Sequence, residues 1–151
     1  MSRAGMEAAF LATTYRVETP ESTFDLRIGV VSAGFDEFLR RQSVSLGKPA
    51  AAGPARTAIG WGIVTAYNPG ERLSDHQNEI RQRRLHERLT ALAGACFAAR
   101  NLADADADWP VEPSYLVLPV DEQLLAALGR EFCQLAVVYG ETGLAPRLLW
   151  L

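Results

Sequence analysis

The segment that most constrains the fold is residues 57–67, TAIGWGIVTAY, in which large and small side chains alternate. With the two-residue period of a β-strand, one face is bulky and the other nearly bare; the bulky face carries Ile59, Trp61, Ile63, Thr65 and Tyr67. A strand that is apolar on both faces is covered on both, so we expect it in the interior of a sheet. Glycines on the bare face allow a helix or a ligand to approach the backbone, and helix packing is the commoner reason.

Period-two patterns predict six further strands, at 13–18, 24–30, 95–101, 114–120, 134–139 and 147–151. The first two form a hairpin, and we expect Arg16 opposite Asp25 because the alternative register would place Arg16 against Arg27. A glycine-rich turn, 140–143, joins the last two strands as an antiparallel pair.

Apolar residues at helical spacing predict helices at 6–12, 34–42, 74–93 and 122–132. Hairpins mixed with crossover helices favour an α+β fold. We therefore expect a single domain over residues 1–151, with a mixed, mainly antiparallel sheet of about six to seven strands and three main helices packed against it. Residues 43–56, with two prolines, two glycines and no periodicity, predict a mobile loop.

Composition excludes several classes of function. A net charge of −3 argues against a general nucleic-acid binder, which needs clustered positive charge. No apolar run is long enough for a membrane span or a signal sequence, so we expect a cytoplasmic protein. The cysteines lie in apolar runs, which is typical of buried thiols in a reducing compartment.

Neither a metal nor a cofactor is expected. His76 and His86 lack the spacing of zinc ligands, and the aspartates at 104, 106 and 108 open like a calcium loop but have Trp109 where the loop needs glycine. The glycines at 60 and 62 do not complete a dinucleotide fingerprint, and no phosphate-binding loop or nucleophile elbow is present in the sequence.

Several short motifs occur together in a specific order. They are Thr65 to Pro69 (TAYNP), the helix start Ser74 to Asn78, Trp109, Glu112 to Ser114 (EPS) and Phe132 to Ala136 (FCQLA). In this order and spacing, from about Tyr15 to Trp150, the chain resembles the bacterial domain-of-unknown-function-3293 family. It departs from the family pattern at Val111, where a second acidic residue is expected, and at Cys133, where glycine is usual. The resemblance supports one domain and singles out residues, but implies no activity.

Five of the polar residues form a candidate ligand site, namely Asn68, Asn78, Arg81, Glu112 and Gln134. Asn68 leaves the central strand, while Asn78 and Arg81 lie on one side of the following helix, whose first-turn amides at 74–77 offer donors to an anion. The set suits a small anionic or nucleotide-like molecule, with Arg81 as charge partner and Glu112 as a general base.

Two alternatives stay open. In the first, each of these residues has a structural explanation, such as turn formation at Asn68. The protein would then act by association, either as a homodimer or with another protein. The contact surface would consist of Trp109, Trp150 and the apolar end 148–151. An enzyme acting on a phosphate-containing small molecule is the second alternative. Convergence of the five residues on one accessible cleft would favour the ligand site, and their separate burial would favour the structural explanation.

Overall fold

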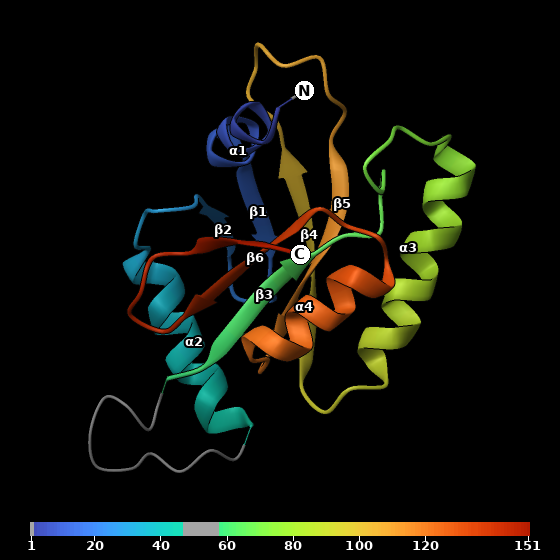
Figure 1. Ribbon diagram of the computed structural model, residues 1–151. Coiled ribbons are helices and arrows are strands. Elements are labelled where there is room, and N and C mark those ends of the chain that lie inside the picture. The colour runs from blue at the N-terminus through green and yellow to red at the C-terminus, as the bar shows by residue number, and fades with distance from the viewer. Residues whose placement is uncertain (1, 47–57) are drawn as a thin grey trace.

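The computed structural model describes residues 2–46 and 58–151 and shows a single α+β domain (Figure 1). The predicted loop 43–56 lies outside these residues from position 47 onward. In chain order the elements are α1 (Arg3–Ala12), β1 (Thr14–Glu18), β2 (Thr23–Leu26), α2 (Ala33–Ser45), β3 (Gly60–Val64), α3 (Asp75–Thr90), β4 (Ala95–Leu102), β5 (Glu112–Leu118), α4 (Glu122–Glu131), β6 (Ala136–Glu141) and β7 (Arg147–Trp150).

The seven strands form one sheet in the order β2-β1-β4-β5-β3-β6-β7, and each neighbouring pair is antiparallel. β3 lies in the interior between β5 and β6, as its two apolar faces predicted. The hairpin has the predicted register, in which Arg16 faces Asp25 with an Nε to Oδ1 distance of 2.8 Å. Local charge pairing therefore predicted this register correctly.

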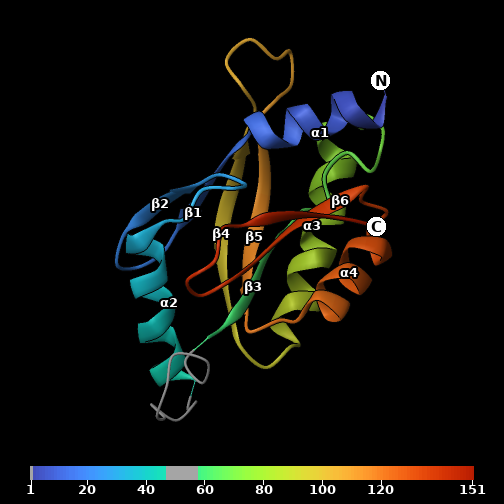
Figure 2. The ribbon, with the colours of Figure 1, turned by 60° about the vertical axis from the view of Figure 1, so that its left-hand side comes forward.

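The sheet is strongly curled, so that its two edge strands approach one another (Figures 1 and 2). The backbone N–H of Gly29, after β2, donates to the carbonyl of Pro146, before β7, at 2.8 Å. Across the curl, Leu26 of β2 belongs to the same buried cluster as Val138 of β6. The concave face thus encloses a core.

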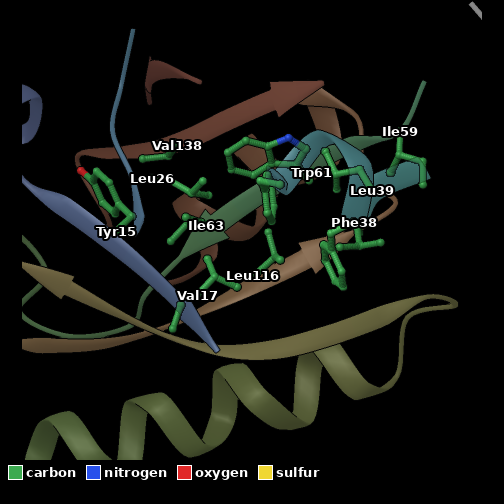
Figure 3. Close-up of a cluster of buried hydrophobic side chains, with 13 residues drawn as sticks. Tyr15, Val17, Leu26, Phe38, Leu39, Ile59, Trp61, Ile63, Leu116 and Val138 are labelled. Atoms are coloured by element: carbon green, nitrogen blue, oxygen red, sulfur yellow. The ribbon is translucent and has the colours of Figure 1, made fainter. Parts of the chain in front are cut away.

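The two faces of the sheet are covered by different helices. Phe35, Phe38 and Leu39 of α2 fill the concave face with Trp61 of β3 (Figure 3). On the other face, α3 and α4 contribute the apolar side chains of a second cluster, Leu85, Leu89, Leu125 and Leu128. Each helix buries its apolar stripe against the sheet, which is the main source of its stability.

Glycines on the bare face of β3 allow α4 to lie close to the strand. A Cβ added at Gly62 would lie 2.4 Å from Cδ1 of Leu125, which is far inside contact distance. Close packing of α4 therefore explains the glycine at position 62, in agreement with the reason that the sequence analysis favoured over ligand binding.

Most element boundaries differ from the prediction by a few residues; α1 begins at Arg3 instead of residue 6, and β2 ends at Leu26 instead of residue 30. α2 continues through residues 43–45, which we had expected in the loop, because Ser43 follows Leu39 by one helical turn and is buried on the same side. α3 ends at Thr90 instead of residue 93, and β3 covers only 60–64 of the predicted strand. The chain turns away after Val64 because the side chain of Gln82 binds the backbone of Ala66 at 2.9 Å.

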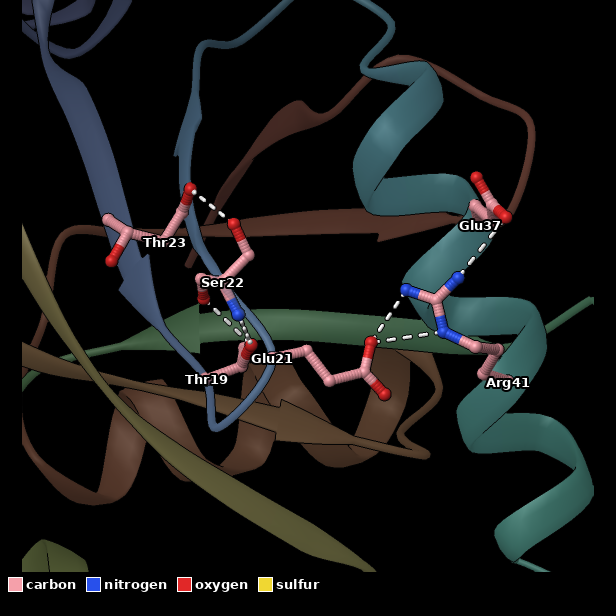
Figure 4. A network of polar contacts seen from close by, with 6 residues as sticks. All are labelled: Thr19, Glu21, Ser22, Thr23, Glu37 and Arg41. Atoms are coloured by element: carbon pink, nitrogen blue, oxygen red, sulfur yellow. Dashed lines mark hydrogen bonds and ion pairs between the residues drawn. The ribbon is translucent and has the colours of Figure 1, made fainter.

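An exposed ion-pair network fastens the β1–β2 turn to α2 (Figure 4). Arg41 of α2 binds Glu21 of the turn, with Nη2 to Oε2 at 2.6 Å, and Glu37 one helical turn earlier at 3.3 Å. All three side chains are well exposed, so each pair contributes little to stability.

Candidate functional site

Asn68 joins three elements at the end of the central strand. Its backbone has φ of 46°, a left-handed conformation that asparagine tolerates better than most residues. Its side-chain Oδ1 accepts from Asn78 Nδ2 and from the backbone N–H of Leu73, both at 2.9 Å. Its Nδ2 donates to Glu112 Oε1 at 2.8 Å. The β3–α3 connection is therefore tied both to α3 and to the start of β5.

The start of α3 uses its own first-turn donors. Ser74 and Gln77 form a capping box, in which the N–H of Gln77 donates to Ser74 Oγ at 3.2 Å and the N–H of Ser74 donates to Gln77 Oε1 at 3.1 Å. One turn into the helix, Asn78 is 2% exposed and its Oδ1 accepts from the backbone N–H of Asn68 at 2.9 Å. Two of the amides that we expected to offer to an anion are thus occupied within the helix.

Arg81 and Gln134 bind backbone carbonyls. The Nε of Arg81 donates to the carbonyl of Ala66 at 2.8 Å, and its Nη2 donates to the carbonyl of Phe132, the C-cap of α4. Gln134 Nε2 donates to the carbonyl of Tyr67 at 3.1 Å. A guanidinium at the C-terminus of a helix also interacts favourably with the helix dipole. These contacts make Arg81 a support for the connection, and they argue against its expected role as charge partner of an anion.

Glu112 is the acidic residue of the set, and it is partly buried. Its Oε1 accepts from Asn68 Nδ2 at 2.8 Å and from Trp109 Nε1 at 2.7 Å. Its Oε2 has no hydrogen-bond partner in the described part of the chain, yet it is absent from the buried unpaired atoms, so it touches solvent. Burial raises the pKa of this carboxyl, and the hydrogen bonds from Asn68 and Trp109 lower it by less. The carboxylate is therefore held in place with one oxygen open.

Two aromatic residues flank this carboxylate. Trp109, which is 46% exposed, has the guanidinium of Arg72 6.0 Å from the centre of its ring. Burial, and then the carboxylates of Glu79, Asp75 and Glu112, raise the pKa of the half-buried Tyr67 hydroxyl. The sequence motifs included Trp109 and Tyr67, but we had given neither a role in the ligand site.

The sheet adds polar side chains that the sequence analysis missed. Asn101 of β4 lies opposite Glu112 of β5 on one side and opposite Tyr15 of β1 on the other. Directly opposite residues of antiparallel strands share a face, so the three form a row. Ser114 Oγ lies 2.7 Å from Asn101 Oδ1. Only the register of strands far apart in sequence reveals this row.

Asn68, Asn78 and Glu112 are hydrogen-bonded to one another, whereas Arg81 and Gln134 bind the backbone carbonyls of Ala66 and Tyr67 in the same connection. The burial of Asn68 and Asn78 fits the structural explanation, and the ligand site stays a prediction. Two shallow hollows elsewhere, of about 380 and 480 Å³, do not include any of the five. The first is lined by Gly60, Pro119, Val120, Asp121, Leu124 and Tyr139, and the second by Arg84, Glu87, Arg88, Ala91, Glu131 and Phe132.

The C-terminal strand, which the association alternative used, lies at an edge of the sheet. Its Trp150 already packs against α1, with the rings of Phe10 and Trp150 5.9 Å apart in an edge-to-face arrangement and the guanidinium of Arg3 4.5 Å from the Trp150 ring. Trp150 therefore holds α1 on the sheet, and a homodimer through this edge stays a prediction.

Within residues 2–46 and 58–151, no group of three or more His, Cys, Asp or Glu side chains is arranged to hold a metal ion. Across the same residues, no helix combines the length and apolar character needed to cross a membrane.

The fold and the network define a single-domain α+β protein whose polar cluster lies where the central strand ends. A family model described as "Protein of unknown function (DUF3293)" matches residues 64–137, a span that contains all five predicted residues, and this match supports membership of the chain in that family. Searches of curated proteins and of solved structures gave no match.

Proposed function

We propose that this protein binds a small, nucleotide-like ligand on the solvent side of the Asn68–Glu112 network. The observation that carries the proposal is the state of Glu112, whose Oε1 is fixed by two donors while its Oε2 is open to solvent. A polar group that is held by buried neighbours and presented at a surface is preorganised for recognition. A carboxyl with a pKa raised by burial is also typical of functional sites.

The other residues of the predicted site support this carboxylate. Asn68 and Asn78 fix the connection behind it, and Arg81 and Gln134 fasten that connection to the end of α4. Arg81 already uses Nε and Nη2 to bind carbonyls, so we assign the anionic part of the ligand to a second cation. Arg72, beside the exposed ring of Trp109, is the candidate on this surface.

A bare inorganic anion is disfavoured at this surface. Glu112 lies there, and Asp75 and Glu79 are close enough to raise the pKa of Tyr67. A nucleotide-like molecule resolves this conflict, because it offers hydrogen-bond donors to Glu112 and a separate negative group to Arg72.

The proposal is tested by thermal unfolding of the protein against a panel of nucleotides, sugar phosphates, amino acids and small anions. A ligand at a hundred times its Kd stabilises the folded state by about 2.7 kcal/mol, which raises Tm by about 5–10 °C for a domain of this size. We expect such a shift with the wild type. Glu112→Gln, which keeps the acceptor but removes the charge and the open oxygen, should abolish it.

Two arginine variants provide the matched comparison. Arg72→Ala should reduce the shift, and Arg83→Ala, an exposed arginine on the outer side of α3, should leave it unchanged. The proposal fails if no compound in the panel raises Tm, or if Glu112→Gln and Arg83→Ala behave alike.

A further inference from the structure

The indole of Trp109 is held in one orientation, with the guanidinium of Arg72 over its ring and much of the side chain exposed. Its Nε1 donates to Glu112 Oε1 at 2.7 Å, and the side chain is 46% exposed. Leaving a large apolar ring in water is unfavourable, and most tryptophans bury more of their surface. The hydrogen bond therefore fixes an aromatic surface beside the open oxygen of Glu112.

The strand register places a residue with a donor opposite Glu112. Asn101 lies directly opposite Glu112, so their side chains share a face about 5 Å apart at Cβ. The Oδ1 of Asn101 is bonded to Ser114 Oγ, whereas its Nδ2 is not one of the buried unpaired atoms and has no partner in the described residues, so it also reaches solvent. The register thus places a residue with a free acceptor, Oε2, and a residue with a free donor, Nδ2, opposite each other on one face of the sheet.

We infer that the ligand carries a nitrogen heterocycle of the aminopurine type, whose ring stacks on Trp109 while its amino group donates to Glu112 Oε2. This inference rests on the proposed function and names the chemistry of the same site. An adenine ring presents an amino donor next to a ring-nitrogen acceptor, which matches Glu112 Oε2 and Asn101 Nδ2. Stacking of a base on an aromatic side chain contributes about 1–3 kcal/mol.

The phosphate of such a ligand would also have a positively charged partner, Arg72. Arg72 lies beside the Trp109 ring, so a phosphate attached through the sugar has a cation on the same side. A sugar phosphate without a base would keep that contact but leave Trp109 and Glu112 unused. The base should therefore contribute most of the binding.

Calorimetric titration with four matched compounds tests the inference: adenosine 5′-monophosphate, purine riboside 5′-monophosphate, ribose 5-phosphate and inorganic phosphate. The first two differ only in the amino group. We expect adenosine 5′-monophosphate to bind, its counterpart without the amino group to bind at least tenfold more weakly, and the two compounds without a base to give no measurable heat.

Two variants distinguish a loss of ring stacking from a loss of folding. Trp109→Ala should abolish binding of adenosine 5′-monophosphate, and Val111→Ala, an exposed neighbour on the same connection, should not. Equal Tm values for these two variants without ligand would show that both fold alike.

Each other outcome overturns the inference in a distinguishable way. If ribose 5-phosphate binds as tightly as the nucleotide, or if the broad panel finds only ligands without an aromatic ring, the base is not recognised, although the proposed ligand site stands. If no compound binds in either experiment, the proposed function fails together with the inference.

Discussion

Asn68 and Asn78 exchange two hydrogen bonds, from the backbone N–H of Asn68 to Asn78 Oδ1 and from Asn78 Nδ2 to Asn68 Oδ1, each 2.9 Å long. Both residues are at most 9% exposed. The reciprocal pair fixes the chain where it leaves the central strand. It also orients the side-chain Nδ2 of Asn68 so that it donates to Glu112. The candidate site is therefore built on a rigid asparagine pair.

Replacing Asn68 should cost stability through two separable effects. Asn68→Gly removes the side-chain bonds but suits φ of 46°, and Asn68→Ala also strains the backbone. We expect Asn68→Gly to lower the free energy of unfolding by about 2 kcal/mol and Asn68→Ala by about 1 kcal/mol more. Urea unfolding measures both. Values within about 0.5 kcal/mol of wild type would mean that the network carries no stability.

Arg81 should matter for folding whether or not a ligand binds. Arg81→Met keeps the apolar stem but leaves the carbonyls of Ala66 and Phe132 without this donor, so we expect a loss of about 2 kcal/mol. Arg83→Met, at an exposed position of the same helix, is the control and should change stability by less than about 0.5 kcal/mol. Equal effects in urea unfolding would contradict the bridging role of Arg81.

The pH dependence of stability should reveal Glu112. Because burial raises its pKa in the folded state, the native protein binds this proton more tightly than the unfolded chain does. The stabilising contribution is fully present below the unfolded pKa of about 4.3 and is lost as pH rises through the folded value. Wild type should therefore gain stability relative to Glu112→Gln as pH falls through this range. A change of the opposite sign would mean that the hydrogen bonds from Asn68 and Trp109 outweigh burial.

Cys133 occupies a position that favours glycine. It follows the C-cap of α4 with φ of 58°, and the bonds from Cys133 N to Arg130 O and from Gln134 N to Gly129 O complete a Schellman motif. Cys133→Gly should stabilise the protein by up to about 1 kcal/mol because the strain of a left-handed side-chain residue disappears. Cys133→Ser should leave the unfolding midpoint close to wild type. A destabilised glycine variant would contradict this account.

The sequence was sufficient where the relevant interactions are local. The register of Arg16 with Asp25, the capping box at Ser74 and the interior position of β3 follow from neighbouring residues and short periodicities. The five residues of the predicted site could also be named, because the resemblance to the family singled out the segments that carry most of them.

Roles that depend on long-range geometry could not be predicted. The sequence could not show that Arg81 points at Ala66 and Phe132, because those carbonyls come from two other elements. Asn101 became part of the site only through the pairing of β4 with β5. The sequence predicted the capping box at Ser74. Only the hydrogen bonds show that this box occupies backbone N–H groups that an anion would otherwise bind.

The most direct test of the ligand site is a titration with adenosine 5′-monophosphate followed by NMR at the indole N–H groups of the three tryptophans. Trp109 lies at the proposed site, while Trp61 is buried under α2 and Trp150 packs against α1, so these two serve as internal controls. Trp109→Phe assigns the signal. A saturable shift of the Trp109 resonance, with Trp61 and Trp150 unchanged, is the predicted result. A Trp109 resonance that stays in place while the others move, or no movement at all, would contradict the account.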